Sequence, residues 1–150
     1  MLKIKPFKQS RGYCGPASLK MILSLYGINK SEKTLAKLTK TSRIKGCSED
    51  NLIRVAKSFG FKGYKKQKSS IEELRGLIKK GIPVIVDWFS PEEGAHYSVV
   101  VGFDKSNIFL ADPHYSKIRK HKISWFEERW FDIFPKPNNL ILREIIVISR

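Results

Sequence analysis

The N-terminal half of the chain carries apolar side chains at helical spacing, in segments that open with a capping residue. After Pro16, apolar residues recur every three or four positions until Gly27, which is typical of a helix with one buried face and a glycine at its end. Three further segments begin at Ser31, Ser48 and Ser70, where a serine hydroxyl can accept a hydrogen bond from the first helical turn. The pattern therefore predicts four helices that start near these positions.

From Pro83 onward, runs of β-branched and aromatic residues replace the helical spacing and predict strands. These runs cover residues 83–89, 94–103, 107–113 and 141–148. Turn-forming residues beginning at Asp104 separate the second run from the third, so we expect these two strands to form a hairpin. Ser124 opens a capping box, Ser-Trp-Phe-Glu, which predicts a short aromatic helix ending near Trp130.

Helices come first and strands follow, without the regular alternation that builds a parallel sheet. This order predicts an α+β fold, with an N-terminal helical part packed on a C-terminal antiparallel sheet. A chain of 150 residues is long enough to bury one substantial core but not two. We therefore expect a single domain over residues 1–150.

Cys14 lies where the first helix is expected to begin. Pro16 suits a first helical turn, because its missing N–H would have no intrahelical partner there. A thiol at a helix N-terminus feels the positive end of the helix dipole, which favours the nucleophilic thiolate. Gly15 is expected to leave open space beside the sulfur for a substrate carbonyl. The alternative is that Cys14 is only a small hydrophobic core residue.

His96 and Asp112 are placed together by the predicted hairpin. His96 stands where its first strand begins, and Asp112 stands where its second strand ends. In an antiparallel hairpin these two ends are neighbours, so the carboxylate is expected beside the imidazole. That arrangement fixes the tautomer of a catalytic histidine and stabilises its protonated form.

Three motifs together resemble a known family. They are Tyr-Cys-Gly-Pro-Ala-Ser-Leu around Cys14, His-Tyr-Ser-Val-Val-Val-Gly-Phe-Asp from His96, and Phe-Leu-Ala-Asp-Pro around Asp112. From about Ile4 to Trp130 the chain is similar to the bacteriocin-processing cysteine peptidases, papain-like enzymes that cut after double-glycine leaders and usually form the N-terminal domain of an ABC exporter.

The resemblance implies a role for each motif residue. Cys14 would be the nucleophile, His96 the general base and Asp112 the residue that orients it. Gln9 would donate from its side chain to the oxyanion. It stands one residue closer to the cysteine than the family's pattern has it, so either the connecting loop is tighter or the oxyanion hole depends on the Cys14 backbone N–H.

These residues predict a papain-like cysteine-type peptidase, a hydrolase that forms an acyl-thioester on Cys14. Its substrates would be peptides or proteins, and leader peptides cut after small residues such as glycine fit the resemblance. Gly15, Tyr13 and Tyr97 are expected to contact the substrate. The same chemistry would also serve an acyltransferase or amidase acting on a non-peptide amide. A non-catalytic basic binding module is disfavoured, because all three triad residues are present.

Other candidates near the site are less specific. The polar loop of residues 90–94 precedes His96 and should border the groove. The pattern leaves open whether Asp87 lies on the sheet face near the site or at the edge of the sheet. His114 follows Asp112 in a loop, where a solvated histidine is the expected state. Cys47 is expected in a loop that enters a helix, and we assign it no role.

Composition changes this picture in two ways. The chain has 29 Lys and Arg residues against 14 Asp and Glu residues, a formal charge of +15 that should attract acidic partners. The charge is diffuse and its densest runs, residues 62–68 and 117–122, look like strands with solvated lysines, so nucleic acid is an unlikely partner. No Cys/His cluster has metal-ligand spacing, and we expect no cofactor.

The N-terminus lacks the apolar segment of a signal peptide, and no run approaches the roughly twenty apolar residues that span a bilayer. We therefore expect a cytoplasmic protein without a transmembrane segment. The pattern leaves its oligomeric state open.

Overall fold

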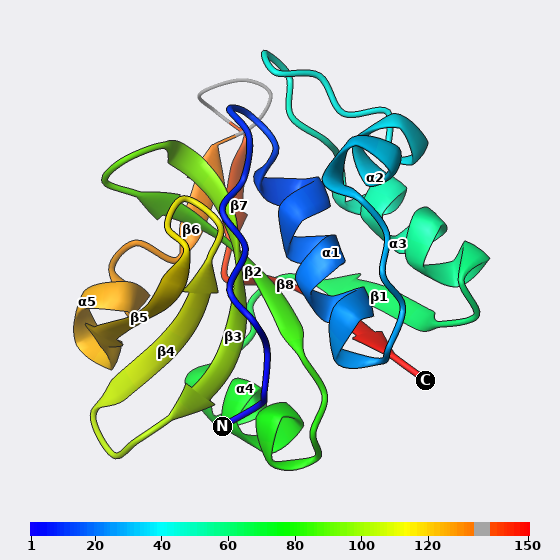
Figure 1. Ribbon diagram of the computed structural model, residues 1–150. Helices are drawn as coiled ribbons and strands as arrows, with labels where there is room; N and C mark the ends of the chain where they lie inside the picture. Colours follow the sequence, from blue (N-terminus) through cyan, green and yellow to red (C-terminus); the bar gives the residue numbers. More distant parts are fainter. Residues whose placement is uncertain (134–138) are drawn as a thin grey trace.

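The computed structural model describes residues 1–133 and 139–150, which form an antiparallel sheet with helices on both faces (Figure 1). The six strands lie in the order β1-β8-β2-β3-β4-β5, and β6 pairs with β7 in a separate two-stranded ribbon. The helices are α1 (Cys14–Leu25), α2 (Glu32–Leu38), α3 (Glu49–Ser58), α4 (Ile71–Lys79) and α5 (Ile123–Glu127). The strands are β1 (Lys62–Lys66), β2 (Val84–Ser90), β3 (Gly94–Phe103), β4 (Asn107–Asp112), β5 (Lys117–Lys122), β6 (Phe131–Ile133), β7 (Leu140–Leu142) and β8 (Glu144–Ser149). The fold is α+β, as the order of the elements predicts.

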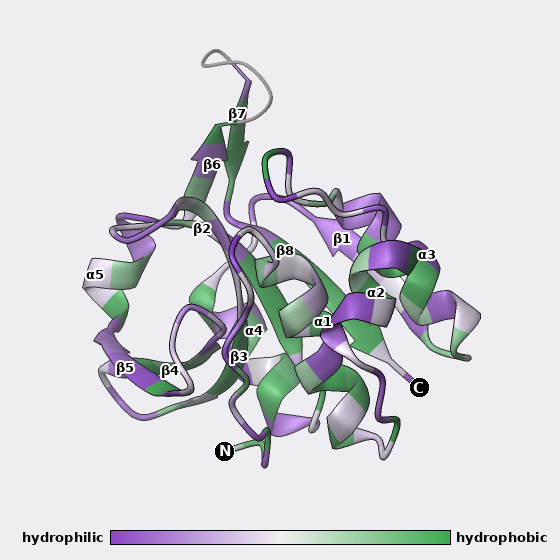
Figure 2. Cartoon of the chain, turned by 45° about the horizontal axis from the view of Figure 1, so that its top comes forward, coloured by the Kyte–Doolittle hydropathy of each residue, from purple (hydrophilic) through white to green (hydrophobic). Residues whose placement is uncertain are grey.

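The alternation of side chains along the central strands gives the sheet two apolar faces. Ile85, Val99 and Ile146 belong to a buried cluster with residues of α1 and α3. Their chain neighbours point the other way and pack with α4, α5 and two buried tryptophans, Trp88 and Trp130. Because successive residues of a strand face opposite sides, one sheet supports both cores. In Figure 2 the central strand β8 is largely green, the colour of hydrophobic residues, whereas the edge strand β5 is largely purple.

The helix starts agree with the capping pattern. The hydroxyls of Ser31, Ser48 and Ser70 accept hydrogen bonds from backbone N–H groups in the first turns of α2, α3 and α4. Gly27, just beyond α1, has φ +80°, a conformation that glycine adopts without strain. The two lysine-rich runs form the edge strands β1 and β5. Lysines at sheet edges keep other chains from pairing there.

Two sequence-based boundaries are wrong. Ser124 does not cap α5, because the helix begins one residue earlier, directly after β5, and has no side-chain cap. The N–H of Ile123 instead donates to the carbonyl of Ser106, at 2.9 Å. The run at residues 141–148 is not one strand. It breaks at Arg143, whose φ of 45° turns the chain from β7 into β8.

Within the described residues, no helix has the length and apolar character needed to cross a membrane.

Candidate active site

Cys14 is the first residue of α1, at the end of the helix where backbone N–H groups lack intrahelical partners. The preceding residue, Tyr13, makes no side-chain cap. The N–H of Cys14 is therefore a candidate donor to the oxyanion that forms on a substrate carbonyl oxygen when the Cys14 sulfur attacks it.

His96 and Asp112 meet at the open end of the β3–β4 hairpin. The Nε2 atom of His96 lies 2.7 Å from Oδ1 of Asp112, and the two side chains are 0% and 2% exposed. The backbone N–H of His114 donates to the same carboxylate oxygen at 3.0 Å. Because Asp112 holds Nε2, the other ring nitrogen, Nδ1, is the one left for a reaction partner.

Charge stabilises this pair despite its burial. Burial opposes ionisation of Asp112, yet the hydrogen bond from His96 outweighs it and lowers the pKa of the carboxyl. Burial likewise opposes protonation of His96, but its interactions with Asp112 and Cys14 raise the pKa of the imidazole to about 10. The pair is therefore an imidazolium beside a carboxylate at neutral pH.

Cys14 and His96 line one cavity of about 90 Å³. Cys47, Tyr97 and Asp87 also line it. The fold thus brings together the three residues expected to form a triad, from a helix in the first half of the chain and a hairpin in the second.

Gln9 lies on the far side of a carboxylate that belongs to Glu93. Its amide Nε2 is 3.3 Å from Oε1 of Glu93, whose other oxygen is 3.3 Å from Nδ1 of His96. The backbone N–H of Gln9 donates to the carbonyl of Pro113 at 2.7 Å, which fixes this segment beside the end of β4. Gln9 therefore reaches the neighbourhood of His96, but its amide is directed at Glu93.

Glu93 was not singled out from the sequence, although its loop was expected to border the site. Its Oε2 is also 2.9 Å from Nδ1 of His114, so His114 contacts the site although its side chain remains 37% exposed. Gln9, Glu93 and His114 line a second cavity of about 310 Å³. The sequence signal for Glu93 was its position three residues before His96, in a turn-rich loop.

The expected substrate-contacting residues lie in different surroundings. The space beside Gly15 is filled, because a Cβ there would collide with Sγ of Cys47 and contact Tyr97. Gly15 therefore lets α1 approach the Cys47 loop, and the expectation of open space beside it is wrong. The ring of Tyr13 lies 4.9 Å from the Arg43 guanidinium. Tyr97 lines the cavity but is 8% exposed.

Cys47 lies directly before the N-cap of α3, in the loop where the sequence places it. Burial raises the pKa of its thiol to about 12, an effect that a hydrogen bond from Thr41 only partly offsets. Cys47 is thus a protonated thiol beside Cys14.

Acidic side chains gather at this cavity although the whole chain is basic. Glu49, Asp87 and Asp132 line it, and Glu144 lies next to Glu49 and Asp87. Asp87 therefore faces the site, which the sequence left open. The charge of +15 does not describe the surroundings of Cys14.

Comparison with known proteins agrees with this geometry. The profile of the Peptidase_C39-like family matches residues 1–133. An uncharacterised protein of Methanothermobacter marburgensis is 32% identical over 95% of this chain and 87% of its own length. The transport/processing ATP-binding protein ComA of Streptococcus pneumoniae is 33% identical over 78% of this chain, which spans 16% of ComA.

Solved structures show the same fold. The peptidase domain of Streptococcus ComA, a bifunctional ABC transporter, superposes with a TM-score of 0.77 and 25% identity, covering 97% of this chain and 98% of that domain. A double-glycine-motif protease from an AMS/PCAT transporter, solved in complex with the leader peptide, superposes with a TM-score of 0.76 and 21% identity over 99% of this chain and 92% of its own. The chain belongs to the Peptidase_C39-like family.

Proposed function

We propose that this protein is a cysteine peptidase that cleaves peptide bonds through an acyl-thioester on Cys14. The observation that carries the proposal is the placement of the Cys14 thiol and the His96 imidazole in one cavity, with Asp112 holding Nε2 of His96 at 2.7 Å. Membership of the Peptidase_C39-like family supports the same chemistry.

In the starting state, the proton of the Cys14 thiol has passed to Nδ1 of His96, which gives the imidazolium described above. In the first half-reaction, the Cys14 sulfur attacks the carbonyl carbon of the scissile peptide. The carbonyl oxygen becomes an oxyanion that the N–H of Cys14 can receive, a contribution of about 3 kcal/mol per donor at such sites. The intermediate collapses as the C–N bond breaks, and His96 returns its proton to the leaving amine. The acyl group stays on sulfur as a thioester.

In the second half-reaction, His96 removes a proton from water, and the resulting hydroxide attacks the thioester. The C–S bond breaks, the carboxylic acid leaves, and the sulfur and imidazole return to their starting state. Asp112 keeps the imidazole in one orientation throughout and stabilises its charged form.

Gln9 joins this mechanism only after a rearrangement. Its amide donates to Glu93 at 3.3 Å, so a substrate oxyanion must replace that carboxylate to use the same donor. The loop of residues 90–94 carries Glu93, and a shift of that side chain would remove one of the two acceptors of the Gln9 amide, the other being the Ser10 carbonyl at 3.2 Å.

The shape of the site favours substrates with small residues at the cut. The cavity beside Cys14 has a volume of only about 90 Å³, which suits glycine better than a large side chain. Two exposed apolar side chains adjoin residues of the cavity wall and offer contacts for the rest of a peptide. Phe89 pairs across the strands with Ala95, Ile133 follows Asp132, and they are 39% and 40% exposed. The leader peptide bound by the double-glycine-motif protease, a protein of the same fold, supports leader peptides as the substrate class.

A cleavage assay with a peptide carrying Gly-Gly before the scissile bond tests the proposal. We expect Cys14→Ser, His96→Gln and Asp112→Asn each to lower kcat/KM, the first two by at least about a thousandfold. His121→Gln and Asp104→Asn are the matched controls, because these residues lie on β5 and in the β3–β4 turn, outside the cavity, and should retain activity.

Mass analysis of the products separates hydrolysis from acyl transfer. Hydrolysis with water gives a free carboxylate, whereas an acyltransferase gives an adduct with an added amine. Cleavage that persists in Cys14→Ser, or an adduct as the main product, would overturn the proposal.

A further inference from the structure

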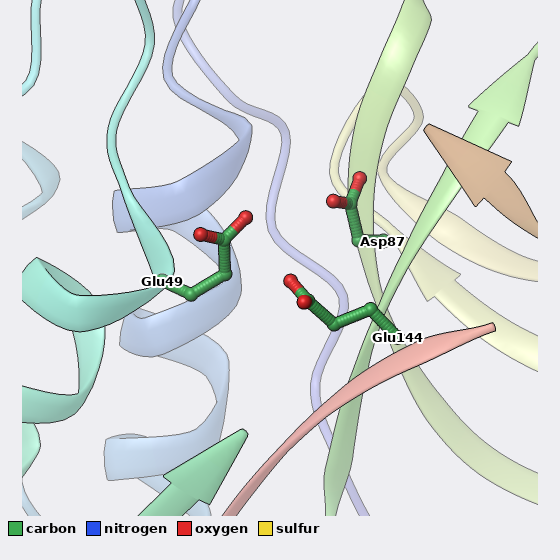
Figure 3. Close-up of side chains that lie close together, drawn as sticks. All are labelled: Glu49, Asp87 and Glu144. Atoms are coloured by element: carbon green, nitrogen blue, oxygen red, sulfur yellow. The ribbon is translucent and has the colours of Figure 1, made fainter. Parts of the chain in front are cut away.

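Three carboxylates from separate elements converge beside the Cys14 cavity (Figure 3). Glu49 comes from the first turn of α3, Asp87 from β2 and Glu144 from the first position of β8. One oxygen atom from each lies within 4.8 Å of the others. Asp87 and Glu144 are direct cross-strand partners, an arrangement in which like charges destabilise a sheet.

Two of these carboxylates are buried and lack partners that buried acids usually have, while Glu49 is half-buried. Asp87 and Glu144 are 2% and 4% exposed, and Oδ2 of Asp87 and Oε1 of Glu144 have no hydrogen-bond partner among the described residues. Glu49 accepts one hydrogen bond, from the hydroxyl of Tyr97 at 3.0 Å. In the described part of the chain, no Lys or Arg forms an ion pair with any of the three.

Leaving such a cluster uncompensated is costly, because an ionised carboxylate loses its hydration when it is buried. Burial and the neighbouring Asp132 raise the pKa of Asp87 well above its usual range. Burial and Glu49 raise the pKa of Glu144 to about 8. The Lys65 ammonium attracts Glu144 but forms its ion pair with Asp50, at 3.1 Å. Two species can relieve the remaining repulsion: protons shared among the carboxyls, or a bound cation.

We propose that Glu49, Asp87 and Glu144 bind one hard divalent cation of the Ca²⁺, Mg²⁺ or Mn²⁺ class. The donor set points to this class, because all the candidate ligands are carboxylate oxygens and the cluster has no thiol or imidazole. Asp87 and Glu144 each have one oxygen without a hydrogen-bond partner among the described residues. Asp132, next to Asp87 on the cavity wall, is a candidate for a fourth ligand.

The ion would fasten the wall of the site rather than take part in the reaction. It would tie the first turn of α3 to two adjacent central strands, β2 and β8. Cys47 and Ser48 lead into that turn and line the cavity with Cys14. The inference stands apart from the proposed peptidase function, because the three ligands are not members of the triad and binding can be measured without turnover.

Calorimetric titration of the chelator-treated full-length chain with CaCl₂, MgCl₂ or MnCl₂ tests the site. We expect one ion to bind per chain for at least one of the three metals. At about one hundred times the dissociation constant, that metal should raise the midpoint of thermal unfolding by about 5–10 °C.

Asp87→Asn and Glu144→Gln should each weaken binding at least about tenfold and abolish the metal-dependent rise in midpoint. Both variants remove repulsion, so the metal-free proteins should fold, which circular dichroism verifies. Glu128→Gln is the matched control, since this exposed glutamate loses the same charge far from the cluster. Absence of stoichiometric binding by wild type up to about 10 mM of each metal, or equal binding by the Asp87 and Glu144 variants, would overturn the proposal and assign the cluster to shared protons.

Discussion

Two cysteines on one cavity wall illustrate how surroundings decide the chemistry of a residue. Cys14 lies at a helix N-terminus and interacts with the imidazole of His96, whose other nitrogen is held by Asp112. Cys47 is half-buried beside it without such a partner, and this burial raises the pKa of its thiol to about 12. Of the two cysteines, Cys14 is therefore the one with an imidazole partner.

Alkylation with iodoacetamide at about pH 6 should therefore label Cys14 and leave Cys47 unmodified. Cys14 shares its cavity with the His96 imidazole, whereas the Cys47 thiol, whose pKa burial raises to about 12, stays in its unreactive protonated form. Peptide mapping by mass spectrometry measures the two sites in one sample. His96→Gln should slow the labelling of Cys14. Equal labelling of the two cysteines would contradict the assignment.

Glu93 contacts two residues of the proposed mechanism. One of its oxygens lies 3.3 Å from the amide of Gln9, and the other lies 3.3 Å from Nδ1 of His96. Glu93→Ala should free Gln9 and raise kcat/KM roughly fivefold, equivalent to about 1 kcal/mol for one lost competing hydrogen bond. Glu92→Ala, which removes a neighbouring exposed carboxylate, should have no such effect. A fall in kcat/KM for Glu93→Ala would mean that this carboxylate assists the reaction instead.

Among the structural elements, the β3–β4 hairpin contributes most to the site. Its open end brings His96 to Asp112, and its stability depends in turn on that buried pair. The pKa of His96 is raised to about 10, so its stabilising effect is fully present below about pH 6.5 and is lost as the pH rises toward 10. The pKa of Asp112 is lowered, so its contribution is present above about pH 4 and is lost in acid.

Asp112→Asn should consequently reduce the free energy of unfolding most between about pH 4 and 6.5, by about 3 kcal/mol for one removed member of a buried pair. The difference from wild type should shrink as the pH approaches 10. Denaturant titrations at a series of pH values measure it. Asp104→Asn, in the turn at the other end of the hairpin, serves as the control. A difference that grows with pH would contradict the charge assignment.

Local signals in the sequence were enough to predict most elements but not their junctions. Serine caps and apolar spacing identified α1 to α4, because these helices are specified within their own segments. Ser124 was misread as a cap because the start of α5 is set by a hydrogen bond to distant Ser106. The break at Arg143 was missed because nothing in an apolar run shows where a strand leaves one sheet for another.

The site was predictable to the same extent. Cys14, His96 and Asp112 follow from motifs and from the geometry of one hairpin. Glu93, His114 and the carboxylate cluster do not, because their importance depends on which segments far apart in the chain become neighbours. The sequence predicted open space beside Gly15, but the Cys47 side chain fills that space.

At the scale of the whole molecule, the net charge of the chain differs in sign from the acidic side chains around Cys14. The formal charge of +15 creates an attractive field for anionic chains approaching from solution. Around Cys14 the cavity wall carries Glu49, Asp87 and Asp132. Acidic residues should therefore help a substrate when they lie outside the cavity, and small neutral residues should be preferred inside it.

Matched peptides test this division. Gly-Gly peptides with acidic flanks should show kcat/KM values roughly tenfold above those with basic flanks at low ionic strength, and the difference should vanish in about 0.5 M NaCl. Bulky residues in place of Gly-Gly should reduce turnover whatever the flanks. Best turnover of basic, bulky peptides, with no effect of salt, would contradict both parts.

The position of β8 between β1 and β2 has a consequence for the timing of folding. β8 follows every other strand in the sequence, yet it supplies the inner partner for both of these neighbours and carries Glu144 to the wall beside Cys14. During synthesis, β1 and β2 emerge from the ribosome long before the strand that joins them, so this part of the sheet stays divided until β8 has been made. A nascent chain thus holds its thiol and its imidazole without a finished cleft around them, and the arrival of β8 makes the cavity wall complete.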